Sequence, residues 1–243
     1  GGGGVGGGGG VGGGVGGGGG VGRGLEGGGI GREDIKLISK CGIQLVTESR
    51  NNKLKHYNYS KEYIVWSAEQ SLKNLQTDYL DTFLLHRPSP LMHPNEIAEA
   101  ITELKESGKI INFGVSNFMP SQINLITEKS PVEVNQIEFS LTQHTAMHNG
   151  SLDQMLQKDI QPMCWSPLGT VFKEHTEQTT RIKKVLTQLA EKYNVKIAYD
   201  GEQALSLFSK QEYALVLLDI QLPCKSQQDK AVAHSGHLYP SDP

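Results

Sequence analysis

The chain has 243 residues with a formal net charge of −3, and this length allows one α/β barrel or two smaller domains. The near-neutral charge balance gives no basis for proposing nucleic acid or an anionic membrane as a partner. No apolar run approaches the roughly 20 residues that span a bilayer, and no signal peptide is visible. Three widely spaced cysteines, Cys41, Cys164 and Cys224, predict reduced thiols in a cytoplasmic protein, not a disulfide framework or a zinc site.

Residues 1–31 hold most of the 30 glycines of the chain, interrupted mainly by valine. Such a segment has few side chains to bury and loses much backbone entropy on ordering. It matches G-x-G-x-x-G at many offsets, but no strand precedes it and no acidic residue follows at the spacing of a dinucleotide-binding unit. We therefore predict a low-complexity leader, flexible or artificial, that carries no readable chemistry.

From residue 32 to about residue 195, short apolar runs alternate with amphipathic helical stretches. Strands are predicted over residues 35–40, 81–86, 110–116, 132–137 and 161–165, and the polar residues 51–59 predict a loop. Helices are predicted after Ser60, from Pro94, after Pro120, around Leu152 and Leu156, and along the apolar stripe of Ile182, Val185, Leu186, Leu189 and Tyr193. This alternation favours parallel βαβ units, and hence a barrel or a doubly wound sheet.

Residues 81–88 show the pattern most clearly, because the run from Thr82 to Leu85 suits a strand that is buried on both faces. His86 then stands at the carboxyl end of that strand, where α/β proteins place their chemistry. The other predicted strands also end in polar or aromatic residues, namely Lys40, Ser116 with Asn117, Gln136, and Trp165 followed by Ser166, Leu168 and Gly169. Since these ends share one edge of a parallel sheet, they indicate a single site.

Five stretches carry a resemblance to a known family. They are Arg-Glu-Asp-Ile-Lys-Leu-Ile-Ser-Lys (32–40), Asp-Tyr-Leu-Asp-Thr-Phe-Leu-Leu-His-Arg-Pro (78–88), Lys-Ile-Ile-Asn-Phe-Gly-Val-Ser-Asn-Phe (109–118), Val-Asn-Gln-Ile-Glu-Phe-Ser (134–140) and Trp-Ser-Pro-Leu-Gly (165–169). In order and spacing, residues 32–195 resemble the aldo-keto reductase family. The resemblance implies an α/β fold, an incomplete (β/α)8 TIM-type barrel with strands 3–7 recognisable. It also implies hydride transfer from NADPH to a small-molecule aldehyde or ketone.

The resemblance also implies roles for the residues at the strand ends. His86 is expected to orient and polarise the carbonyl oxygen, and Lys40 to lower the pKa of a tyrosine proton donor. Ser116, Asn117 and Gln136 are expected to hydrogen-bond the nicotinamide carboxamide. The remaining cofactor-binding residues are Trp165, which stacks on the nicotinamide, and Ser166, Leu168 and Gly169, whose backbone follows the diphosphate.

The chain departs from the family before Lys40. The family's proton-donating tyrosine and its partner aspartate belong to a region that is glycine here, and the first two strands are missing with them. Tyr57 and Tyr59 lie on the wrong side of Lys40 to match that tyrosine. We therefore expect little or no turnover from this chain.

Residues 196–223 resemble a different family, the response-regulator receiver domain, as a partial flavodoxin-like fragment with Asp219 as phosphoryl acceptor. The fragment lacks the acidic pair that holds Mg²⁺, so little neutralises the transition-state charge. Residues 224–243 are polar and predict disorder. Two alternatives follow: a signalling chain phosphorylated at Asp219, and a non-functional chimera with open sheet edges. His144 and His148 have i, i+4 spacing without the glutamate of a metalloprotease motif, which predicts a loop.

Overall fold

A computed structural model describes residues 4–5, 31–46 and 52–196, together with residues 203, 206, 207 and 210. Asp219, the tail 224–243 and nearly all of the leader lie outside the described residues, so the predictions made for them stay predictions.

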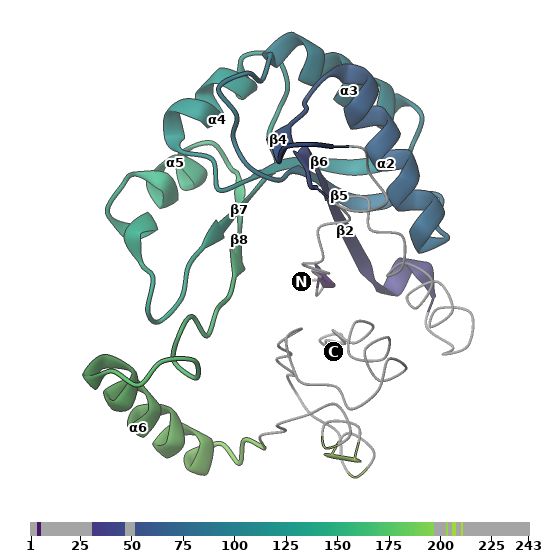
Figure 1. Cartoon of the computed structure of the whole chain (residues 1–243). Coiled ribbons are helices and arrows are strands. Elements are labelled where there is room, and N and C mark those ends of the chain that lie inside the picture. Colours follow the sequence, from purple (N-terminus) through teal and green to yellow (C-terminus); the bar gives the residue numbers. More distant parts are fainter. Residues whose placement is uncertain are drawn as a thin grey trace.

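One parallel sheet organises the described chain. Its strands are β1 (Gly4–Val5), β2 (Lys36–Cys41), β5 (Leu80–Leu85), β6 (Ile110–Ser116), β7 (Val134–Glu138) and β8 (Gln161–Trp165), hydrogen-bonded in the order β1-β2-β5-β6-β7-β8. The helices are α2 (Lys61–Leu75), α3 (Pro94–Glu106), α4 (Pro120–Thr127), α5 (Ser151–Gln157) and α6 (Glu177–Lys192), with short 3₁₀ helices η1 (Arg32–Asp34) and η2 (Thr145–Met147). The sheet curls, and helices cover its outer, convex side (Figure 1).

The five predicted strands are confirmed as β2, β5, β6, β7 and β8, with small shifts of their bounds. The α/β prediction is also confirmed, because the curled parallel sheet with outer helices is a half-barrel of the TIM type. The predicted loop 51–59 differs in one respect. His56 and Tyr57 form β4, which pairs antiparallel with β3 (Ile43–Gln44), because the chain folds back beside the end of β2.

The core lies between the outer face of the sheet and the helices. Phe83, Leu85, Phe113 and Val115 alternate along β5 and β6 and are fully buried in this layer. The helix side of the core consists of Ile64, Ala68 and Leu72 from α2, Ile97, Ala100, Ile101 and Leu104 from α3, Ile123 and Ile126 from α4, and Met155 from α5. Helix α6 stands apart from the sheet (Figure 1), and none of its predicted stripe is buried: Val185 is 53% and Leu189 43% exposed, while Ile182 and Leu186 are half-buried.

A buried carboxylate joins the starts of β2 and β5. Asp81 accepts hydrogen bonds from the Leu37 backbone N–H at 2.9 Å and from Arg32 at 2.8 Å, and Lys36 lies 3.1 Å from its second oxygen. Burial alone raises the pKa of Asp81, but these three donors outweigh it and hold the pKa below its usual value. The ion pairs therefore fix the register in which the two strands approach the site.

Candidate active site

Strand register gathers the predicted residues on the inner face of the sheet. Lys40 pairs with Leu84, and Leu84 pairs with Gly114, so these three positions form one row across the sheet. His86 and Ser116 lie two residues further along the same strands and therefore share that face. Their odd-numbered neighbours on β5 and β6 point to the helices. The polar row thus stands on the concave side, at the carboxyl ends.

Gly114 allows β6 to pack closely against its neighbours β5 and β7 within this row. A Cβ on Gly114 would lie 2.5 Å from the Val134 carbonyl oxygen and 2.7 Å from Leu84 Cδ2. Both distances are shorter than carbon atoms tolerate, and one of the neighbours is backbone. Glycine at this position lets β6 and β7 approach beneath Ser116.

Lys40 and Arg87 form a cationic corner around His86 at the ends of β2 and β5. The His86 backbone N–H donates to the Cys41 carbonyl at 2.9 Å, which extends the pairing of the two strands past the sheet. Burial, and then the charges of Lys40 and Arg87, lower the pKa of His86 to about 4, so its imidazole is neutral near pH 7. Burial and Arg87 lower the pKa of Lys40 to about 8. No carboxylate of the described residues pairs with Lys40.

Four of the predicted cofactor-binding residues are directly linked. The Asn117 backbone N–H donates to the Gln136 carbonyl at 2.8 Å, and the Asn117 side chain donates to Ser116 Oγ at 2.8 Å. Asn117 has a positive φ of 61°, which turns the chain over the end of β6. The indole N–H of Trp165 donates to Asn117 Oδ1 at 2.9 Å. The structure therefore brings β6, β7 and β8 together at one polar surface.

Gln136 carries an acceptor that the described protein does not use. The residue is buried, and its Oε1 has no hydrogen-bond partner among the described residues. A buried amide oxygen without a donor is costly, and such atoms in native proteins commonly await a ligand or water. The donor that fits this atom is an N–H group arriving from the inner face.

Gly169 lies in the turn after β8 and contacts the loop after β7. Its backbone N–H donates to the Ser166 carbonyl at 2.7 Å, so the group is engaged within the turn. Gly169 has a φ of 55°, and a Cβ there would lie 2.0 Å from Thr142 Oγ1. The glycine is thus required for packing on the loop after β7. Ser166 shares the left-handed conformation, at φ 50°, and Leu168 is half-buried in the turn.

Two residues at the site were not among the predicted ones. The Arg87 guanidinium carbon lies 5.7 Å from the centre of the Trp165 ring, within the range of a cation–π contact. The Tyr59 hydroxyl bonds the backbone of Arg87. Adjacency to His86 was a usable signal for Arg87. Tyr59 had none, because its contact joins residues 28 positions apart.

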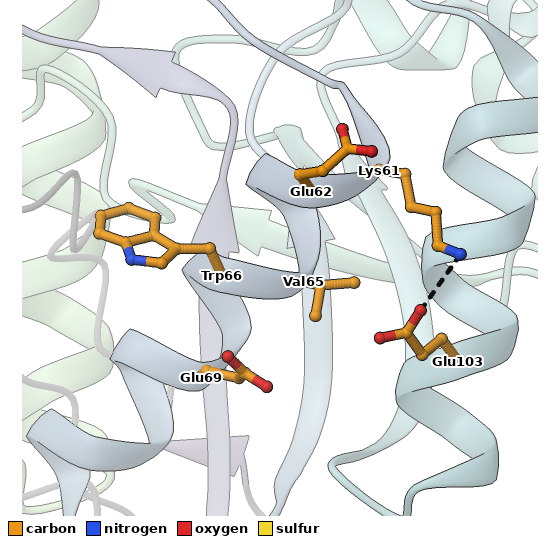
Figure 2. A pocket seen from close by; sticks show the side chains of 6 residues that line it. All are labelled: Lys61, Glu62, Val65, Trp66, Glu69 and Glu103. Atoms are coloured by element: carbon orange, nitrogen blue, oxygen red, sulfur yellow. Dashed lines mark ion pairs between the residues drawn. The ribbon is translucent and has the colours of Figure 1, made fainter.

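A groove on the outer surface is a separate feature. Figure 2 shows it between α2 and α3, lined by Lys61, Glu62, Val65, Trp66, Glu69 and Glu103. Lys61 lies 3.2 Å from Glu103, and Lys109 lies 2.6 Å from Glu69. Two of its three carboxylates are therefore already paired with lysines, and the groove lies on the helix side of the sheet, away from the polar row.

The described residues hold no cluster of three or more metal-ligating side chains. His144 and His148 flank η2, exposed, with their rings edge to face at 5.9 Å. A search of the described helices found none long and apolar enough to cross a membrane.

Known proteins with similar sequences and folds point to one family. The family model described as "Aldo/keto reductase family" matches residues 21–215. An uncharacterized oxidoreductase of Bacillus subtilis, YcsN, is 46% identical over 160 residues, which is 64% of this chain and 53% of that protein. The oxidoreductase YdhF of Escherichia coli is 41% identical over 165 residues, 67% of this chain and 55% of that protein. A solved aldo/keto reductase from Brucella melitensis has a TM-score of 0.52 at 27% identity, covering 72% of this chain and 59% of its own.

The chain spans about half the length of the curated relatives that it matches. The family match runs to residue 215 and so enters the segment 196–223 that the sequence assigned to a receiver fragment. The comparisons give no support for a receiver.

Proposed function

Because the chain belongs to the aldo/keto reductase family, we propose that it binds NADPH at the carboxyl ends of its strands and serves hydride transfer to a small aldehyde or ketone. One observation carries the proposal. Lys40, His86, Ser116 and Gln136, from four adjacent parallel strands, lie on the same inner edge of the sheet.

The cofactor-binding half of the proposal rests on Gln136. Its buried, unpaired Oε1 fits the amide N–H of a nicotinamide carboxamide, with Ser116 and Asn117 beside it at the end of β6. Trp165 is held by Asn117 and offers a ring face for stacking. When bound, the cofactor supplies the hydride. The residues of this chain hold the carboxamide and thereby fix which ring face is presented.

The catalytic half rests on the cationic corner. A neutral His86 can donate an N–H hydrogen bond to a carbonyl oxygen, which polarises the bond. Lys40 is mostly protonated at pH 7 and can stabilise negative charge that develops on that oxygen. Both groups act in a half-buried setting, where solvent screens their charges less than in bulk water.

We propose that turnover by this chain is low. The sequence holds no tyrosine before Tyr57, and the Tyr59 hydroxyl is bonded to the backbone of Arg87. The free thiols Cys41 and Cys164 accord with a cytoplasmic setting, which we include in the proposal.

Fluorescence titration with NADPH tests the proposal, and Gln136→Leu is the decisive variant. Losing the amide should weaken binding about tenfold, the size of one neutral hydrogen bond left unmade. Gln161→Leu is the matched control, because Gln161 is exposed at the opposite end of the sheet, on β8. Equal NADPH affinity in both variants, or no binding by the parent chain, would overturn the proposal.

A further inference from the structure

Tyr59 connects the segment before α2 to the residues that follow β5. The side chain is only 6% exposed. Its hydroxyl donates to the Arg87 carbonyl and accepts the Arg87 backbone N–H at 3.2 Å. Both backbone groups of one residue are therefore held by a single side chain, immediately after His86.

The position of the Tyr59 ring is itself fixed from the side of β2. Gly42 has a φ of +110°, and a Cβ there would lie 2.0 Å from Tyr59 Cε1, so the ring lies directly on the glycine backbone. The Asn58 N–H donates to the Gly42 carbonyl at 2.9 Å, and Ile43 pairs with Tyr57 in the β3–β4 ladder. The ring thus has one available place, between the ends of β2 and β5.

Arg87 connects Tyr59 to Trp165 on the other side of the half-barrel. Its guanidinium lies over the Trp165 ring, and the Trp165 indole N–H bonds Asn117. The contacts form a continuous series from Tyr59 through Arg87 and Trp165 to Asn117. The series joins the strand ends that carry the catalytic half of the site to those that carry the cofactor-binding half.

Tyr59 does not suit the role of proton donor. Burial raises the pKa of its hydroxyl, whereas a general acid in this chemistry needs a pKa nearer the working pH. The hydroxyl proton is also engaged by the Arg87 carbonyl.

We infer that Tyr59 is a positioning residue: by holding the Arg87 backbone, it keeps the guanidinium over Trp165 and so sets the place of the indole that receives the cofactor. The effect on Trp165 follows from the contacts alone, whereas the effect on cofactor affinity rests on the proposed function.

Tyr59→Phe tests the inference, because it removes the hydroxyl and leaves the ring on Gly42. The chain has two tryptophans, so Trp66→Phe, on the exposed face of α2, provides a background in which Trp165 is the sole tryptophan and can be excited selectively over tyrosine. In that background Tyr59→Phe should raise acrylamide quenching of Trp165 about twofold and weaken NADPH binding about threefold to tenfold. Tyr57→Phe, a neighbouring tyrosine with an exposed side chain, should change neither.

Arg87→Met is the second variant, because it removes the cation directly and should change Trp165 quenching in the same direction. Unchanged quenching in Tyr59→Phe, with a lower melting temperature and an altered signal in Arg87→Met, would leave Tyr59 a purely structural residue and overturn the inference. If the parent chain fails to bind NADPH while Tyr59→Phe still alters Trp165, the proposed function fails and the positioning of Trp165 stands.

Discussion

The middle of the half-barrel and its last strand–helix unit differ greatly in burial, although both follow the same strand–helix pattern. All six residues of β5 are buried, and α3 buries Ile97, Ala100, Ile101 and Leu104. On β8, Gln161, Pro162 and Cys164 are exposed, and α6 buries only Thr179 among its described residues. An apolar stripe decides which face of a helix can be buried, but burial needs an opposing surface. The stability of the described chain therefore comes mainly from the core between strands β2 to β7 and helices α2 to α5, and little of it from α6.

Truncating one leucine on α3 and one on α6 should show this difference in burial at its largest. Leu104→Ala on α3 removes a fully buried side chain and should lower the free energy of unfolding by about 3 kcal/mol. Leu189→Ala on α6 removes a side chain that is 43% exposed and should cost less than about 0.5 kcal/mol. Urea unfolding followed by circular dichroism measures both. Similar losses would mean that α6 is buried in solution.

Asp81→Asn should come next in size, because it removes the charge that joins β2 to β5. Arg32, which is part-buried, and Lys36, which is half exposed, would keep their charges without the carboxylate, and the loss should be about 2 kcal/mol, the size of a hydrogen bond to a charged group. Asp78→Asn, three residues earlier and exposed, is the control and should be nearly neutral. Chemical denaturation of the two variants side by side decides between them.

Acid should lower the stability of the packed middle of the half-barrel through His86. Its pKa is about 4 in the folded chain and 6.5 in the unfolded chain, so between these values the unfolded state binds more protons. Stability attributable to His86 is therefore complete above pH 6.5 and falls as the pH drops toward 4, by on the order of 1 kcal/mol once solvent screening is discounted. Melting temperatures from pH 7 to pH 4 should fall less steeply in His86→Gln than in the parent. Parallel curves would contradict the assignment.

The two helix caps offer the smallest contrast. The Ser60 side chain accepts the Tyr63 N–H at the start of α2, and the Thr176 side chain accepts the Thr179 N–H at the start of α6. Ser60→Ala should lower global stability by about 1 kcal/mol, because α2 belongs to the core. Thr176→Ala should instead speed hydrogen exchange within α6 alone. Global destabilisation by Thr176→Ala would show that α6 unfolds together with the sheet.

Apolar runs made the strands predictable from the sequence. Lys40, His86 and Ser116 are polar residues that each end an apolar run. Parallel strands bring such ends to one edge, so the polar row also followed from local pattern. The β4 strand was missed because His56 and Tyr57 are exposed and pair only through the return of the chain beside β3.

The remaining site geometry depends on tertiary contacts that no local pattern encodes. The role of Tyr59 requires the positive φ of Gly42 and the approach of Arg87, neither of which is visible near residue 59. The packing of Gly169 is a further example, because a Cβ there would meet Thr142 from another loop.

Gly114 has a consequence for anyone wishing to redesign the mouth of this half-barrel. Even alanine there meets the Val134 carbonyl and the Leu84 side chain, so the position admits a single amino acid. A combinatorial library that varies Ser116 or Gln136 can explore new ligand shapes, provided that residue 114 is excluded from randomisation. Ser116 and Gln136 can thus be varied, whereas Gly114 beneath them cannot.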